Sequence, residues 1–192
     1  GDAVKSENYF KPNKDGHSYA NELVNQITNL NKGIYLDEEM LNPNPTNFCT
    51  GVAGYPEKHM EAPSIKSDIH FLKKKIKAGA DYIITQMFFD NADFFHFEEK
   101  CRNAGIEVPI IPGIKILSST RQLTLIPKNF FVNIPTELSD EVDENPEHAK
   151  EIGIQWCSRQ CEGLLNHGMK NIHFYIMSGA NVVTEVLKKI SK

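Results

Sequence analysis

An aromatic ring, a carboxylate, an ammonium group and an imidazole follow directly on a run of small apolar residues. The stretch CTGVAGYPEKHMEAP covers residues 49–63, and in it Tyr55, Glu57 and His59 come just after an apolar run typical of a buried strand. Loops that follow parallel strands carry the functional residues of many α/β proteins. We therefore expect this loop to lie at a functional site, with His59 either as a ligand-binding residue or as a solvated loop histidine.

Polar residues also end the next two apolar runs. Gln86 follows Ile83 and Ile84, and a buried amide is costly unless it is hydrogen-bonded. Because an amide both donates and accepts, Gln86 suits the edge of a heteroaromatic ligand. Lys115 ends the run IIPGIKI, where a lysine could form a Schiff base, although no acidic partner is evident nearby. Phe88 and Phe89 are interpreted as core residues in preference to a stacking platform.

The histidines and cysteines do not indicate a metal site. Seven histidines are scattered along the chain, without the H-E-x-x-H spacing of zinc enzymes. Cys157 and Cys161 are four residues apart on a predicted helix, but two cysteines without further nearby ligands make a poor zinc site. We expect no metal, and reduced, half-buried thiols.

Strand-like and helix-like stretches alternate along the chain. Ser64 and Asn91 are predicted N-caps, and Gly33, Gly79 and Gly105 are predicted stops. The pattern predicts strands at 48–55, 81–90, 108–117 and 171–177, and helices at 18–33, 64–80, 91–105, from 118 onward, 136–168 in two pieces broken near Asn145-Pro146, and 181–190.

This alternation predicts a parallel sheet covered by helices, built from four βα units. A doubly wound sheet and a (β/α)8 barrel both begin in this way. Gly51 and Gly54 lie inside a strand, so the G-x-G-x-x-G turn of a dinucleotide fold is absent. A complete barrel needs roughly 250 residues. We expect residues 1–192 to form a single domain, an incomplete (β/α)8 TIM-type barrel with a polar-aromatic site at its strand ends.

Composition restricts the possible partners. The 192 residues are 40% hydrophobic and 24% charged, with a formal net charge of -4, which does not favour nucleic acid as a partner. No apolar run approaches the roughly 18 residues of a membrane span, and no signal-peptide pattern opens the sequence, so we expect a cytoplasmic protein. The lysines within 73–77 suit a solvated helix face, or a phosphate-rich ligand nearby.

At these same residues the sequence resembles the methylenetetrahydrofolate reductase family. The matching segments are GVAGYPEKHMEA, SDIHFLKKKIKAGADYIITQMFFD, AGIEVPIIPGIKI and IHFYIM, in the order and spacing of the family. The resemblance implies a (β/α)8 barrel that binds FAD at its strand ends. Its reaction passes a hydride from NADH or NADPH to the flavin and then to 5,10-methylenetetrahydrofolate, which gives 5-methyltetrahydrofolate in one-carbon and methionine metabolism.

The resemblance also assigns residues. It implies that Asp2 is catalytic, beside the flavin and the folate pterin, at the end of the family motif L-R-G-D. Lys75 and His59 suit the pyrophosphate of the cofactor, and Asp68 suits a ribose hydroxyl. The implied cofactor contacts are Gly1, Asp2, Tyr19, Tyr55, His59, Ala62, Asp68, Lys74 and Lys75, and the implied folate contacts are Gln86 and Gln122.

Several family features do not occur in this sequence. In the family about three further βα units precede Gly1, including the glutamate proposed as general acid, so we expect this chain alone to be inactive. The alternative is a non-catalytic half-barrel that self-associates, and a homo-oligomer is expected. A third hypothesis is a metal- or Schiff-base-dependent barrel enzyme.

The end of the sequence also differs from the family pattern. The run HFYIMSGANVV lacks the arginine that many relatives have after the last strand. The regulatory domain of animal and fungal relatives is absent as well, which suggests a bacterial-type architecture.

Overall fold

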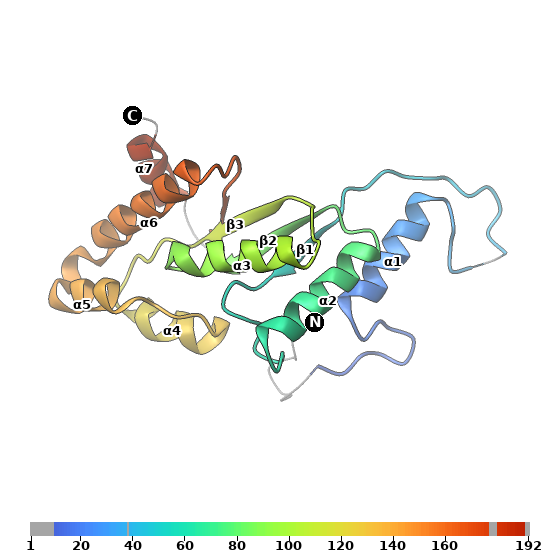
Figure 1. Cartoon of the computed structure of the whole chain (residues 1–192), viewed down its shortest axis with the longest axis horizontal. Coiled ribbons are helices and arrows are strands. Elements are labelled where there is room, and N and C mark those ends of the chain that lie inside the picture. The colour runs from blue at the N-terminus through green and yellow to red at the C-terminus, as the bar shows by residue number, and fades with distance from the viewer. Residues whose placement is uncertain (1–9, 38, 177–179, 191–192) are drawn as a thin grey trace.

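Four parallel strands form one sheet, and their order in space follows their order in the chain (Figure 1). The computed structural model describes residues 10–37, 39–176 and 180–190. The strands are β1 (Gly51–Gly54), β2 (Tyr82–Met87), β3 (Ile110–Ile114) and β4 (His173–Phe174). The helices within these residues are α1 (Ala20–Asn31), α2 (Ile65–Lys77), α3 (Asn91–Asn103), α4 (Arg121–Phe130), α5 (Thr136–Glu144), the 3-10 helix η1 (Pro146–His148), α6 (Ala149–Asn166) and α7 (Asn181–Ile190).

The alternating pattern of the sequence is therefore confirmed as an α/β fold with four βα units. Parallel pairing joins β1 to β2, β2 to β3, and β3 to β4. Within the described residues the sheet leaves one edge of β1 and one edge of β4 without a neighbouring strand. Four βα units agree with the incomplete barrel expected from the sequence, and the (β/α)8 barrel type stays a prediction.

Local sequence signals explain where the helices begin and end. The hydroxyl of Ser64 accepts a hydrogen bond of 3.1 Å from the backbone N–H of Ser67, which caps α2 as expected. The predicted cap of α3 is wrong by one residue, because Asp90 is the N-cap and accepts from the N–H of Ala92. The side chain of Asn91 instead donates to the carbonyl of Gln160 in α6, so a tertiary contact outcompetes the capping role.

The break predicted near Asn145-Pro146 is confirmed. Helix α5 ends at Glu144, Asn145 has non-helical backbone angles, and Pro146 starts the short helix η1. Proline has no N–H to donate into a preceding turn, so α5 cannot run on into α6.

The main hydrophobic core lies between the sheet and the helices that cover one of its faces (Figure 1). Phe88 and Phe94 stack there with their ring centroids 5.4 Å apart, and both side chains are fully buried. Cys157 and Cys161 are buried in this core and form no disulfide. Cys101 is buried in the same core, and this burial raises the pKa of its thiol to about 12. The sequence analysis expected half-buried thiols, and this is wrong in both directions: Cys49 is exposed, whereas Cys101, Cys157 and Cys161 are fully buried.

The opposite face of the sheet is uncovered in the part of the chain that the structure describes. Side chains of a strand alternate between the two faces. Val52 and Ile83 are buried under the helices, while the alternate residues are exposed or half-buried. We call this second surface the open face; it consists of Ala53, Tyr82, Ile84, Gln86, Ile111, His173 and Tyr175.

Candidate functional site

The loop between β1 and α2 brings together three residues that the sequence analysis assigned to cofactor binding. Tyr55 follows β1 directly, and its ring meets that of His59 edge to face, with centroids 4.6 Å apart. The backbone N–H of His59 donates to Oδ2 of Asp68 in the first turn of α2, at 2.8 Å. All three side chains are half-buried, so they form an ordered polar-aromatic wall at the carboxyl end of β1.

Lys58 organises this loop, a role that sequence reasoning did not assign to it. Its backbone has a φ of 106°, a conformation that costs energy for a residue with a side chain. Its Nζ donates to the carbonyl oxygens of His59 at 3.1 Å and Ala62 at 2.7 Å. The lysine thus folds back over its own loop and positions His59 and Ala62, the latter also an expected cofactor contact.

Glu57 ties the same loop to the connection between α4 and α5. Its carboxylate accepts hydrogen bonds from the backbone N–H of Asn133, at 2.9 and 3.1 Å, and a further contact from the Asn133 side-chain amide. Burial, with a smaller contribution from the nearby carboxylates of Asp93 and Asp90, raises the pKa of Glu57 to about 7. The hydrogen bonds from Asn133 act in the opposite direction but are the weaker influence.

This raised pKa predicts a pH-dependent stability. The ordinary value is 4.5, so the folded chain binds the Glu57 proton more tightly than the unfolded chain does. The resulting stabilisation is present below pH 4.5 and is lost as the pH rises through about 7. Glu57→Gln removes the charge and keeps an oxygen that accepts from Asn133. At pH 8 we expect this variant to be more stable by about 1 kcal/mol after allowance for solvent screening, or roughly 2–4 °C in Tm.

Thermal unfolding at pH 4.5 and pH 8 tests this expectation. At pH 4.5 much of Glu57 is protonated and the difference between the variant and the unmodified chain should largely disappear. Glu147→Gln is the matched control, because that side chain is exposed, and it should leave the Tm unchanged at both pH values. An equal Tm for Glu57→Gln and the unmodified chain at pH 8 would contradict the prediction.

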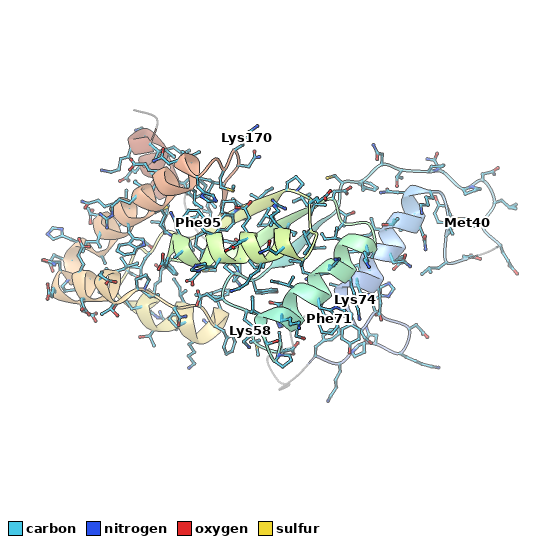
Figure 2. The ribbon with its side chains drawn as sticks, viewed as in Figure 1. Met40, Lys58, Phe71, Lys74, Phe95 and Lys170 are labelled. Carbon is cyan, nitrogen blue, oxygen red and sulfur yellow. The ribbon has the colours of Figure 1, made fainter. Side chains whose placement is uncertain are left out.

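The two lysines expected to contact the cofactor lie on different sides of α2. Nζ of Lys75 donates to the carbonyl of Ala53 at 2.9 Å, on the edge of β1 that has no neighbouring strand among the described residues. Burial lowers the pKa of Lys75, and the carboxylate of Asp68 partly offsets this. Lys74 instead lies over the ring of Phe71 at 4.9 Å, on the outer surface of α2 (Figure 2). The fold therefore groups Lys75 with Asp68, but not Lys74.

The remaining expected cofactor contacts are not grouped with this loop. Tyr19 is the N-cap of α1 and 66% exposed, and among the described residues no hydrogen bond or ring contact joins it to the β1–α2 loop. Gly1 and Asp2 lie outside the residues that the structure describes, so the catalytic role expected for Asp2 stays a prediction.

Both glutamines expected to bind folate use their amide oxygens locally. Oε1 of Gln86 accepts from the N–H of Met87 at 2.9 Å, and Oε1 of Gln122 accepts from the N–H of Ser118 at 2.7 Å. No partner for either amide NH₂ group is present in the described part of the chain. Each glutamine therefore offers donors to a ligand, whereas for Gln86 the sequence analysis expected both a donor and an acceptor.

A cavity of about 90 Å³ lies at the carboxyl ends of β3 and β4. Lys115, Gln122 and Tyr175 contribute to its lining, and Nζ of Lys115 donates to the carbonyl of Tyr175 at 3.2 Å. The hydroxyl of Tyr175 reaches across β3 to donate to the carbonyl of Thr85 at 2.8 Å. Burial lowers the pKa of Lys115, and no carboxylate in residues 10–37, 39–176 or 180–190 pairs with it. A Schiff-base role thus lacks an acid among these residues.

Three other sequence interpretations concern the core, metal ions and membrane spans. Phe88 and Phe89 are buried, which confirms that they are core residues. No cluster of three or more histidine, cysteine, aspartate or glutamate side chains that could bind a metal ion occurs in the described residues. In the same residues no helix is both long and apolar enough to cross a membrane.

Comparison with known proteins identifies relatives over the whole of this arrangement. The family model described as methylenetetrahydrofolate reductase matches residues 1–191. Methylenetetrahydrofolate reductase 2 of Saccharomyces cerevisiae is 32% identical over 197 residues, which cover 100% of this chain and 31% of that protein. The 5,10-methylenetetrahydrofolate reductase of Escherichia coli is 37% identical over 139 residues, or 71% of this chain and 47% of that protein.

A solved structure shares the fold at lower similarity. It is an uncharacterized protein from Clostridium thermocellum that binds two copies of 5-methyl-5,6,7,8-tetrahydrofolic acid, with a TM-score of 0.54 and 18% identity. The match covers 74% of this chain and 52% of that one. The chain thus spans about a third of the yeast relative and about half of the bacterial one.

Proposed function

Because this chain belongs to the methylenetetrahydrofolate reductase family, we propose that it is part of a flavin-dependent enzyme that reduces 5,10-methylenetetrahydrofolate to 5-methyltetrahydrofolate. FAD is the cofactor, and NADH or NADPH is the hydride donor. The observation that carries this proposal is the convergence of Tyr55, His59 and Asp68 at the end of β1, next to the strand whose end bears Gln86. We further propose that the four βα units are the later part of a (β/α)8 barrel.

The residues at the β1 edge fit a dinucleotide cofactor. Lys75 is a half-buried cation whose hydrogen-bond partner is a neutral carbonyl, so its charge is available to phosphate oxygens. Asp68 uses one carboxylate oxygen for the His59 backbone, which leaves the other for a ribose hydroxyl. We propose that Lys75 and His59 bind the pyrophosphate and that Tyr55 and Ala62 line the same wall. The flavin, when bound, supplies a ring that accepts and returns a hydride.

The residues on the neighbouring strands suit folate. Gln86 and Gln122 each present an NH₂ group, which can donate to the carbonyl and ring nitrogens of a pterin or to a carboxylate oxygen. We propose that Gln86 orients the pterin, and that Gln122 contacts the substrate further along. Asp2, by resemblance to the family, is proposed to lie beside the reacting ring, where its negative charge supports a cationic form of the substrate.

A visible absorption titration with FAD tests the cofactor site. We expect saturable binding by the unmodified chain, weakened about tenfold or more in His59→Ala, because a tenfold loss corresponds to about 1.4 kcal/mol, the strength of one charge-assisted hydrogen bond. His70→Ala is the matched control, since His70 is an exposed histidine on α2 and should not change the affinity.

Two outcomes would contradict the proposal. No binding by the unmodified chain at any accessible FAD concentration would show that these residues do not form the nucleotide site. Equal affinities for His59→Ala and His70→Ala would show that binding occurs elsewhere. Separately, turnover of folate by the chain alone would contradict the assignment of the general acid to the family's earlier βα units.

A further inference from the structure

The cavity at the carboxyl ends of β3 and β4 contains a cation to which the proposed function gives no role. Lys115 lines it directly after β3, and Gln122 lines it from the first turn of α4. Most of the remaining lining is apolar and includes Ile114, Val182 and Val183. The cavity therefore combines hydrogen-bond donors with aliphatic walls.

Lys115 is an ammonium group without a counter-charge in the described part of the chain. Its Nζ donates to the carbonyl oxygen of Tyr175 at 3.2 Å, which uses one of the three N–H groups of this side chain. Burial lowers the pKa of Lys115, and no carboxylate among residues 10–37, 39–176 and 180–190 offsets this effect. A half-buried charge is costly without a partner of opposite sign, so an anion in the cavity would stabilise the cation.

Gln122 adds a donor whose orientation is fixed. Its Oε1 accepts hydrogen bonds from the backbone N–H of Ser118 at 2.7 Å and from the Ser118 hydroxyl at 3.3 Å. A backbone N–H can only donate, so the amide atom that faces it must be the oxygen. The NH₂ group, which has no acceptor among the described residues, is therefore left for a ligand.

The first turns of two helices also line this cavity. Gln122 belongs to the first turn of α4, and Val182 and Val183 belong to the first turn of α7. The N-terminal end of a helix carries a partial positive charge, which favours an anion nearby. The backbone thus acts in the same direction as Lys115.

The donors and the size of the cavity define the class of ligand. One cation and one amide NH₂ group match the single charge and the two oxygen atoms of a carboxylate. A phosphate group carries more charge and more acceptor oxygens than these two side chains can satisfy. The cavity measures about 90 Å³, whereas sites that enclose a whole drug-sized molecule measure roughly 300–1,000 Å³. It therefore accommodates one end of a ligand.

We propose that Lys115 and Gln122 bind the carboxylate of a ligand, with the ammonium group on one carboxylate oxygen and the amide NH₂ group on the other. The aliphatic walls then contact the methylene groups next to that carboxylate. A folate ends in a glutamate, so it is one source of such a group, and this source rests on the proposed function. A small free carboxylic acid is the other source. In both cases Lys115 selects an anionic ligand end and forms no covalent bond.

Isothermal titration calorimetry of the full chain, without FAD, tests the proposal. The probes are the diacid para-aminobenzoyl-glutamate, its uncharged diamide, and glutarate. We expect the diacid to bind at least tenfold more tightly than the diamide, because hydrogen bonds between charged groups are the stronger ones. Lys115→Met should remove this preference, and Lys115→Arg, which keeps the cation, should retain most of it. Lys128→Met is the matched control, because Lys128 is an exposed lysine on α4, and it should leave the preference unchanged.

NMR of the unmodified chain gives a second readout that does not depend on a variant that folds. We expect the side-chain NH₂ signals of Gln122 to shift when the diacid is added and to stay in place when the diamide is added. Tighter binding of para-aminobenzoyl-glutamate than of glutarate would support the folate end as the source, and equal affinities for these two acids would support a small free acid.

Four outcomes would overturn the proposal. These are no binding of either acid, equal affinities for the diacid and its diamide, an unchanged preference in Lys115→Met, and NMR shifts confined to residues outside the cavity. Because FAD is not added, failure of the cofactor site in its own titration is a separate result and leaves this test unaffected.

Discussion

Gly153→Ala is expected to lower the free energy of unfolding by about 3 kcal/mol or more, which corresponds to a fall in Tm of roughly 6–12 °C. Gly153 lies in α6 where the helix crosses the segment after β3. A Cβ at this position would lie 1.7 Å from the carbonyl oxygen of Leu117. The obstacle is backbone, so no change of rotamer can relieve it, and α6 must move away from the strand end that carries Lys115.

The sign of this effect distinguishes packing from helix propensity. Alanine is favoured over glycine by about 1 kcal/mol in a helix interior, so propensity alone predicts a more stable variant. Gly16→Ala is the control, because its added Cβ would meet atoms no closer than 3.4 Å. Thermal and denaturant unfolding of both variants measure the difference, and a Gly153→Ala variant as stable as the unmodified chain would contradict the close approach of α6.

Phe94→Ala is expected to destabilise the chain by about 3–5 kcal/mol. The Phe94 ring is fully buried and stacks on Phe88, the residue that follows β2. Removal of the ring loses its burial and leaves a cavity between α3 and the sheet, because the surrounding strands can close only part of the gap. The effect reaches the site as well, since β2 and its C-terminal residues hold Gln86 in place.

Phe71→Ala is the matched control for this variant. Phe71 is a helix residue of the same type but 47% exposed, and its ring contacts Lys74 on the surface. We expect its loss to change stability by less than about 1 kcal/mol. Chemical denaturation of both variants is the measurement, and similar losses for Phe94→Ala and Phe71→Ala would contradict the core described above.

Lys75→Ala is expected to weaken FAD binding. Nζ of Lys75 lies at the edge of β1, where it donates to the carbonyl of Ala53, and we propose that it binds a phosphate group of the cofactor. A titration of Lys75→Ala with FAD, beside the exposed Lys74→Ala as control, measures this effect.

The order of elements in this protein was readable from its sequence. Alternating apolar patterns, Ser64 as a cap and the break near Asn145-Pro146 all act within a few residues of one another, so they do not depend on the rest of the fold. The βα alternation in turn predicts a parallel sheet, because each crossover returns the next strand in the same direction. The position of the loop with Tyr55 and His59, at a strand end, follows from the same pattern.

Only the tertiary structure decided which side chains meet. Glu57 and Asn133 are 76 residues apart, and nothing local to either residue indicates that they are bonded. Lys74 and Lys75 are neighbours in sequence, yet one lies over Phe71 and the other reaches the edge of β1, because adjacent helix positions point about 100° apart. Short-range periodicity determines which face of an element a residue occupies, whereas its partners depend on how elements distant in the chain pack together.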